Sequence, residues 1–124
     1  MLVNEVMNRN VVVVKKDATL KQASEVMAKT RIGSLVVVEG AKISGIITSS
    51  DIIRSIAQDK APENTLIEEV MSKRVFTVAP DASIEDAVDM MVENKIRELP
   101  VVEPKLIASI ASLLSMQFPG YRGG

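Results

Sequence analysis

Thr48 and Asp51 are the two residues of this 124-residue sequence whose types and spacing most clearly suggest chemistry. Thr48 stands where an apolar strand pattern gives way to a helical one, so its hydroxyl and nearby backbone N–H groups can face an anion. Asp51, in the first turn of that helix, can accept charge-assisted hydrogen bonds from two adjacent hydroxyl groups. Any helix could also use these residues as an N-cap and as an acid favoured by the helix dipole. The pair alone leaves a ligand site and a structural role open.

Composition removes several other kinds of site. The chain has no cysteine and no histidine, so the usual zinc ligands, a thiol nucleophile and the commonest general base near neutral pH are missing. Lys and Arg number 15 against 16 Asp and Glu, and a net charge of −1 supplies no basic surface for nucleic acid. No Walker-type glycine loop supports phosphoryl transfer. We therefore expect no metal, no required cofactor, no nucleic-acid partner and no enzymatic activity.

The apolar runs of the sequence are short. The longest, such as Val11 to Val14 and Leu35 to Val38, are far shorter than a bilayer-spanning helix. The N-terminal residues show no signal-peptide pattern. The sequence therefore predicts a cytoplasmic protein with no membrane partner.

The chain contains an internal repeat. Residues 5–39 realign with residues 69–103 at a shift of roughly 64 positions, and each half is one duplicated supersecondary unit. The first-copy residues that keep their type in the second copy are Glu5, Val6, Met7, Val11, Val14, Asp17, Ala18, Ala23, Met27, Ile32, Leu35, Val37, Val38 and Glu39. We predict a first repeat over residues 1–60, a second over 65–116 with an atypical C-terminal part, and a mobile tail over 117–124.

Hydrophobic periodicity predicts the same elements in both copies. A short lead-in helix is expected at 2–7 and again at 66–71, each followed by a buried strand, a helix and a second strand. The first copy continues into a third strand and a second helix. The expected strands are 11–14, 35–38, 43–48, 75–78 and 99–102, and the expected helices begin near Leu20, Ser49 and Ile84.

Two segments give the repeat a family resemblance. They are Gly45-Ile-Ile-Thr-Ser-Ser-Asp51-Ile-Ile-Arg54 in the first copy and Asn94-Lys-Ile-Arg97-Glu-Leu-Pro100-Val-Val102 in the second. Together they resemble a tandem CBS-domain pair, or Bateman module, over roughly residues 1–110, of the kind that regulates IMP dehydrogenase. The resemblance implies an α/β (α+β) fold of two β-α-β-β-α repeats related by a pseudo-two-fold, with packed sheets and flanking helices. It also implies adenosine-containing ligands in clefts between the repeats, and disc-shaped homodimers.

The resemblance further implies which residues bind. Thr48 would contact a phosphate, Asp51 the two ribose hydroxyls, and Arg97 the phosphate from the other repeat. An exposed ion pair to Glu98 is the alternative for Arg97, and core packing is the alternative for Phe76 as a base-stacking residue. The predicted ligand-binding residues are Gly45, Ile46, Ile47, Thr48, Asp51, Phe76, Thr77, Ile96 and Arg97.

The end of the second copy departs from the family pattern. An alignment without a gap places Ser109, Ser112 and Ser115 against Gly45, Thr48 and Asp51. A one-residue gap instead places Ala111 and Leu114 against the last two. Neither alignment restores an aspartate, so we predict one competent nucleotide site per chain. Residues 105–116 are expected to form only part of the missing strand and helix.

Two functions follow from these expectations. The first is a stand-alone regulatory module that senses AMP, ADP or ATP, or alternatively S-adenosylmethionine, and signals to an unknown protein. The second is a scaffold or dimerisation module whose nucleotide cleft is vestigial. Ligand binding discriminates between them, because both predict a homodimer.

Overall fold

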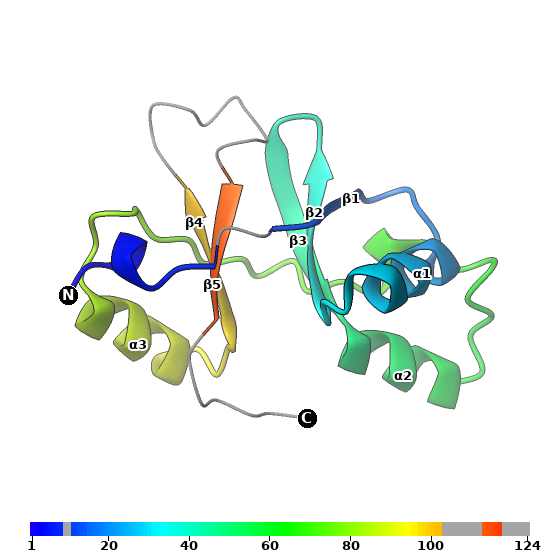
Figure 1. Cartoon of the computed structure of the whole chain (residues 1–124). Helices are drawn as coiled ribbons and strands as arrows, with labels where there is room; N and C mark the ends of the chain where they lie inside the picture. The colour runs from blue at the N-terminus through cyan, green and yellow to red at the C-terminus, as the bar shows by residue number, and fades with distance from the viewer. Residues whose placement is uncertain (9–10, 103–112, 118–124) are drawn as a thin grey trace. The chain divides into compact units, whose positions relative to one another are not determined.

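The computed structural model describes residues 1–8, 11–102 and 113–117, with backbone alone for the last segment (Figure 1). The chain divides into two compact units, and each is described here by itself. Unit 1 comprises Met1–Val11 and Phe76–Gly124, and unit 2 comprises Val12–Val75. The boundaries of the units therefore differ from those of the sequence repeats. The N-terminal segment belongs to the same unit as the second repeat, and the segment up to Val75 belongs to the same unit as the first.

Unit 2 is a three-stranded sheet with two helices. Its strands are β1 (Val13–Lys15), β2 (Ser34–Glu39) and β3 (Lys42–Thr48), in the order β1-β2-β3. β1 is parallel to β2, and β2 is antiparallel to β3. The helices are α1 (Leu20–Thr30), which follows β1, and α2 (Ser49–Ala57), which follows β3. A 3-10 turn, η2 (Ile67–Glu69), completes the unit.

Local sequence explains where α1 begins and which side is buried. Thr19 accepts a hydrogen bond from the N–H of Gln22, and the Gln22 side chain accepts one from the Thr19 N–H, forming a capping box. Leu20, Ala23 and Met27 recur at helical spacing and are all buried. The core of unit 2 that they join contains Leu20, Ala23, Met27, Leu35, Val37, Ile47, Ile52 and Ile67.

Unit 1 contains the elements that correspond to those of unit 2, from the N-terminal segment and the second repeat. They are the 3-10 turn η1 (Val3–Glu5), the helix α3 (Ile84–Glu93) and the strands β4 (Glu98–Val102) and β5 (Leu113–Gln117). β4 and β5 are antiparallel. The core of this unit is formed by Val3, Val78, Ala87, Met91, Leu99 and Val101.

The strand predicted over residues 75–78 is wrong in extent, because the structure has only an isolated parallel bridge between Val78 and Val101. Pro100 gives a physical reason. In unit 2, the N–H of Val36 donates to the carbonyl of Val12 at 3.1 Å and helps to hold β1 against β2. Pro100 is the repeat counterpart of Val36 and has no N–H to donate.

The C-terminal alignments also need correction. Gln117 pairs with Glu98 in the β4–β5 ladder, as Thr48 pairs with Ser34 in the β2–β3 ladder. Gln117 is therefore the structural counterpart of Thr48, whereas Ser115 lies within β5 opposite Pro100 and does not replace Asp51. The predicted mobile tail of residues 117–124 is wrong at its first residue, because Gln117 belongs to β5. Ser109, Ala111, Ser112 and residues 118–124 lie outside the described residues.

Each lead-in segment packs against the repeat that it does not precede in sequence. The N–H of Val3 donates to the carbonyl of Ala82 at 2.9 Å, and the N–H of Ile67 donates to the carbonyl of Ala18 at 2.8 Å. These two bonds are equivalent under the repeat, and the side chains of Val3 and Ile67 are both fully buried. The predicted lead-in helices are thus short 3-10 turns that complete the opposite core.

Lys16 forms an ion pair on the surface of unit 2. Its ammonium contacts the Glu39 carboxylate and lies 3.8 Å from the carboxylate of Glu68 in η2. The hydrogen bond and charge of Glu39 raise the pKa of Lys16, and Lys16 in turn lowers the pKa of Glu39. Lys16, which directly follows β1, thereby lies between acidic residues of β2 and η2.

Candidate functional site

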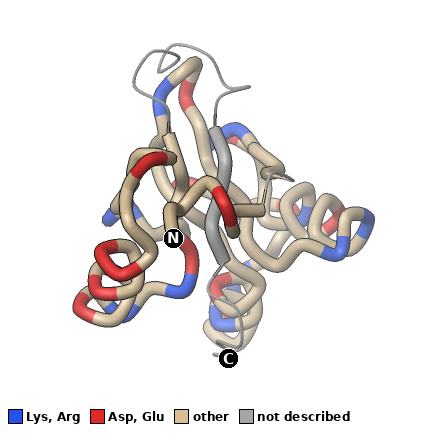
Figure 2. Tube along the Cα trace, turned by 60° about the vertical axis from the view of Figure 1, so that its left-hand side comes forward, with Lys and Arg blue, Asp and Glu red and all other residues tan. Residues whose placement is uncertain are grey.

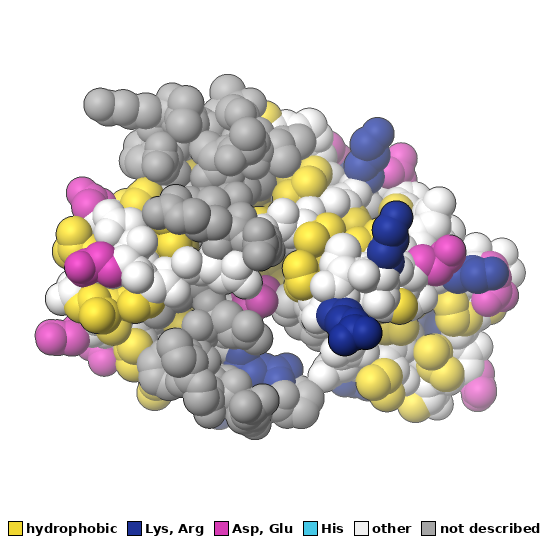
Figure 3. Space-filling model, in the orientation of Figure 1, with side chains coloured by type: hydrophobic (Ala, Val, Ile, Leu, Met, Phe, Trp, Pro, Cys, Tyr) yellow, Lys and Arg dark blue, Asp and Glu magenta, His cyan; other side chains and the backbone are white. Residues whose placement is uncertain are grey.

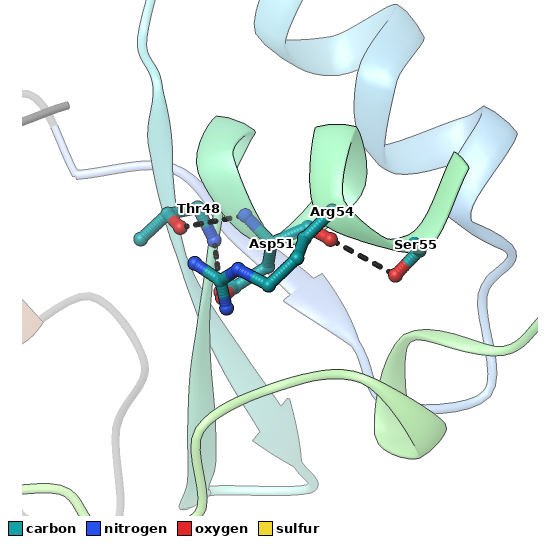
Figure 4. A network of polar contacts seen from close by, with 4 residues as sticks. All are labelled: Thr48, Asp51, Arg54 and Ser55. Carbon is teal, nitrogen blue, oxygen red and sulfur yellow. Dashed lines mark hydrogen bonds and ion pairs between the residues drawn. The ribbon is translucent and has the colours of Figure 1, made fainter. Parts of the chain in front are cut away.

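Thr48 and Asp51 form a reciprocal pair at the junction of β3 and α2 (Figure 4). The Thr48 N–H donates to Asp51 Oδ2 at 2.9 Å, and the Asp51 N–H donates to Thr48 Oγ1 at 3.2 Å. Thr48 is the N-cap of α2, and Asp51 occupies the N3 position, so the two form a capping box. Thr48 and Asp51 therefore do cap the helix, which is the structural role that the sequence left open.

Arg54 and Ser55 extend this arrangement along α2. The Arg54 guanidinium donates to Asp51 Oδ1 at 3.4 Å, and the Ser55 hydroxyl donates to the Asp51 carbonyl at 2.9 Å. The side chain of Asp51 is 16% exposed, whereas that of Arg54 is 65% exposed. Sequence reasoning did not assign Arg54, although its place three residues after Asp51 is where an acid and a base meet on a helix.

Gly45 is required by packing within unit 2. A Cβ atom at this position would lie 2.6 Å from the carbonyl oxygen of Ser72 and 2.7 Å from the sulfur of Met71. The backbone of Ile46 exchanges two hydrogen bonds with Ser72, of 3.0 Å and 2.9 Å, which holds the 71–72 segment against β3. Gly45 thus lets another backbone approach the strand closely.

Ile46 and Ile47 of β3 differ in exposure. Ile47 is fully buried in the core of unit 2, so only its backbone can face a ligand. Ile46 points to the other face of the strand and is half-buried. Its side chain is the apolar surface of β3 that remains accessible next to Thr48.

Four predicted site residues belong to unit 1. Phe76 and Ile96 are half-buried and pack against the core of that unit, as the structural alternative for Phe76 proposed. Thr77 is exposed and Arg97 is half-buried. The structure therefore brings Thr48 and Asp51 together within unit 2 and places Phe76, Thr77, Ile96 and Arg97 in the other unit.

Unit 2 has a surface pocket away from Thr48 and Asp51. It has a volume of about 330 Å³ and is lined by Val14, Lys15, Asp17, Ala18, Gln22, Ala23 and Val26, from β1 to α1. None of the predicted ligand-binding residues lines it. The site proposed at Thr48 and Asp51 therefore does not coincide with this pocket.

The described part of the chain contains no cluster of three Asp, Glu, His or Cys side chains able to hold a metal ion. No described helix is long and apolar enough to cross a membrane.

The fold of the two units defines a pair of CBS-type repeats, and comparison with known proteins agrees. The CBS domain family model matches residues 3–58 and 67–112. The chain is 32% identical over 112 residues to the CBS domain-containing protein YhcV of Bacillus subtilis, which covers 90% of this chain and 79% of that protein. This chain belongs to the CBS-domain family, and its predicted resemblance and fold class are confirmed.

Solved structures show the same fold. A CBS-domain protein from Burkholderia ambifaria superimposes with a TM-score of 0.76 at 31% identity, over 88% of this chain and 77% of the other. The CBS domain pair of protein MJ0100, solved with 5′-methylthioadenosine and S-adenosyl-L-methionine, has a TM-score of 0.78 at 26% identity, over 91% of each chain. The chain spans only 61%, 59% and 40% of the next three curated relatives, so it matches part of longer proteins.

Proposed function

We propose that this chain is a regulatory module that binds an adenosine-containing nucleotide, AMP, ADP or ATP, and signals its presence to a partner protein. The observation that carries the proposal is the Thr48–Asp51 pair at the N-terminus of α2. The solved complex of the MJ0100 domain pair with two adenosyl compounds supports this ligand class, and it makes S-adenosylmethionine a further candidate.

The hydrogen bonds of Asp51 suggest how a ribose would bind. Asp51 Oδ2 is held by the Thr48 N–H at 2.9 Å, which fixes the orientation of the carboxylate. Oδ1 is held by the more distant and largely exposed Arg54. Two ribose hydroxyls could replace that contact at a small cost, since exposed ion pairs are worth only about 0–1 kcal/mol. The capping role and the ligand-binding role of Asp51 are therefore compatible.

The remaining proposed contacts need both units. Ile46 supplies an apolar surface near Thr48, while Phe76, Thr77 and Ile96 are proposed to contact the base and Arg97 the phosphate. Gly45 and Ile47 would contribute backbone only, because Gly45 has no side chain and Ile47 is buried. A ligand held by both repeats shifts a conformational equilibrium only if it binds one arrangement more tightly, and that difference would be the signal.

The experiment is a thermal-shift series with AMP, ADP, ATP, S-adenosylmethionine and GMP on wild type and Asp51→Ala. At about one hundred times its dissociation constant, a ligand stabilises the fold by roughly 2.7 kcal/mol and raises Tm by several degrees. We expect a rise with one adenosyl compound that is at least halved in Asp51→Ala.

Gln22→Ala is the matched control, because Gln22 occupies the same N3 position in the capping box of α1. This variant loses a comparable cap but no proposed ligand contact, so its ligand-induced shift should equal that of wild type. Retention of the shift in Asp51→Ala would reject the site. Absence of a shift with every compound would favour the scaffold with a vestigial cleft.

The other expectations accompany this proposal. We propose a homodimer formed through CBS–CBS packing, a regulatory rather than an enzymatic role, and no nucleic-acid partner. The cytoplasmic location remains a prediction. The regulated protein would be found by a pull-down from the source organism with and without the ligand that shifts Tm.

A further inference from the structure

The surface pocket of unit 2 takes no part in the proposed nucleotide site. Its volume of about 330 Å³ lies near the lower end of the range of small-molecule sites. Val14, Ala18, Ala23 and Val26 supply its apolar part. Ala23 is fully buried in the core of unit 2, and the other three pack against that core. Gln22 also lines the pocket, but its amide oxygen is engaged in the capping box of α1. The apolar part of the pocket therefore rests on fixed elements.

Two opposite charges, those of Lys15 and Asp17, also line the pocket. The N–H of Ala18 donates to the carbonyl of Lys15 at 3.2 Å, and this bond closes a turn that contains both residues. Both are exposed, and among the described residues neither side chain forms an ion pair. The neighbouring Lys16 forms its ion pairs with acids of β2 and η2. The ammonium of Lys15 and the carboxylate of Asp17 are therefore available to a ligand.

The second copy lacks this combination of groups. Ala79 stands at the position of Lys15, so the cation is absent there. Met90 stands at the position of Val26, is longer than valine, and packs against the core of unit 1. The first turn of the corresponding helix α3 is acidic, and its acidic positions are red in Figure 2. A ligand with a carboxylate would be repelled by that turn, so only the first copy offers these surroundings.

A ligand that matches both charges carries a carboxylate and an ammonium close together. An α-amino acid has both groups on one carbon atom, and an aliphatic side chain would cover the apolar part of the pocket. Lys15 has a flexible four-carbon side chain, which lets its ammonium reach over the pocket. Lys and Arg side chains project beside exposed hydrophobic ones on the face drawn in Figure 3. The complementary ligand is therefore a free aliphatic α-amino acid.

We propose that the pocket lined by β1 and α1 is a binding site for a free α-amino acid with an aliphatic side chain, such as leucine. Lys15 binds its carboxylate, Asp17 binds its ammonium, and its side chain lies against the apolar residues of the pocket. Because the pocket is open to solvent and covers only part of such a ligand, its dissociation constant is in the millimolar range. The site is a second input to the module, and it does not depend on nucleotide binding.

The experiment titrates the isotope-labelled chain with L-leucine and follows the backbone amide signals by NMR. We expect saturable shifts at the amides of Ala18, Gln22 and Val26, which lie around the pocket. Isocaproate lacks the ammonium of leucine, and isoamylamine lacks its carboxylate. Each analogue leaves one charge of the pocket unpaired, so each should bind at least about ten-fold more weakly than L-leucine.

Two variants place a residue of the second copy into the first. Lys15→Ala, which introduces the residue found at Ala79, should raise the dissociation constant for L-leucine at least about ten-fold. Val26→Met, which introduces the residue found at Met90, should fill the pocket and abolish the shifts. Asp17→Asn keeps the shape of the side chain and removes its charge, and it should weaken binding as Lys15→Ala does.

Lys29→Ala is the matched control, because it removes a lysine charge from the last turn of α1, outside the pocket. It should leave the dissociation constant for L-leucine within about two-fold of wild type. Asp51→Ala is the second control, and it should also bind L-leucine as wild type does. This result would separate the amino-acid site from the proposed nucleotide site, so the two proposals can fail independently.

Four outcomes would overturn the proposal. The first is no saturable shift with L-leucine up to about 50 mM, or shifts confined to residues outside the pocket. The second is equal binding of L-leucine by wild type and Lys15→Ala, and the third is equal binding of isocaproate and L-leucine by wild type. The fourth is loss of L-leucine binding in Asp51→Ala, which would place the ligand in the proposed nucleotide site.

Discussion

Asp51 holds the start of α2 in place before any ligand is present. Its carboxylate accepts hydrogen bonds from the Thr48 N–H and the Arg54 guanidinium. The sequence allowed both a capping role and a ribose-binding role for this residue. The contacts establish the first role and leave one carboxylate oxygen with an exposed, replaceable partner.

Gly45 is the residue for which the structure changes the interpretation most. We expect Gly45→Ala to destabilise the fold by about 1–3 kcal/mol, because the new methyl group would lie 2.6 Å from a backbone carbonyl oxygen that cannot move cheaply. Urea unfolding of the variant measures this loss. Gly33→Ala is the control, since its nearest neighbour would be the Ser49 hydroxyl oxygen at an ordinary 3.4 Å. Equal stability of the two variants would contradict this explanation.

The need for glycine at position 45 could not be predicted from the sequence, because it depends on a partner segment. Gly45 follows a β-bulge in the β2–β3 ladder, and Ser72 approaches from beyond the end of α2. Thr48 and Asp51 were predictable because helix capping is local and uses residues three apart. Local chemistry was therefore recoverable at this site, and the close approach of a distant backbone was not.

At the level of elements, the repeat in the sequence does not coincide with the structural units. Residues 1–11 belong to unit 1 with the second repeat, and η2 belongs to unit 2 with the first. The helices and the β2–β3 hairpin followed from periodicity, which depends on burial within one element. The exchange of the lead-in segments could not be predicted from periodicity. Both copies have the same apolar pattern, so the core of either unit could accept either segment.

This exchange makes a prediction about which unit each lead-in segment stabilises. Ile67→Ala should destabilise unit 2 by about 2–5 kcal/mol, since it empties a fully buried position in that core. In native-state hydrogen exchange, the amide of Val37 in β2 should exchange faster, with a smaller effect on Val101 in β4.

Val3→Ala is the reciprocal variant, because Val3 is fully buried in the core of unit 1. It should accelerate exchange at Val101 more than at Val37. If both variants accelerated both amides equally, the two units would unfold together and the measurement would not support separate contributions from the exchanged segments.

For the whole molecule, the two units share a fold but differ in the residues at the proposed site. The strand register places Gln117 where unit 2 has Thr48, and the residue three positions later in the sequence is Gly120, where the first copy has Asp51. A glycine supplies no carboxylate to accept the ribose hydroxyls. We therefore expect the proposed second cleft to lack this polar contact whichever of the alignments is used.

We therefore expect one adenosyl ligand per chain at saturation. A charge-assisted hydrogen bond is worth about 1.5–3 kcal/mol, so loss of the aspartate alone should weaken the second cleft by at least about ten-fold. Isothermal titration with the ligand that gives the thermal shift should yield a stoichiometry of one. Asp51→Ala should raise the dissociation constant at least about ten-fold, whereas Gln22→Ala should leave it unchanged. Two equivalent ligands per chain would show that the second cleft holds the ribose without an aspartate, and that the carboxylate of Asp51 is not what distinguishes the two clefts.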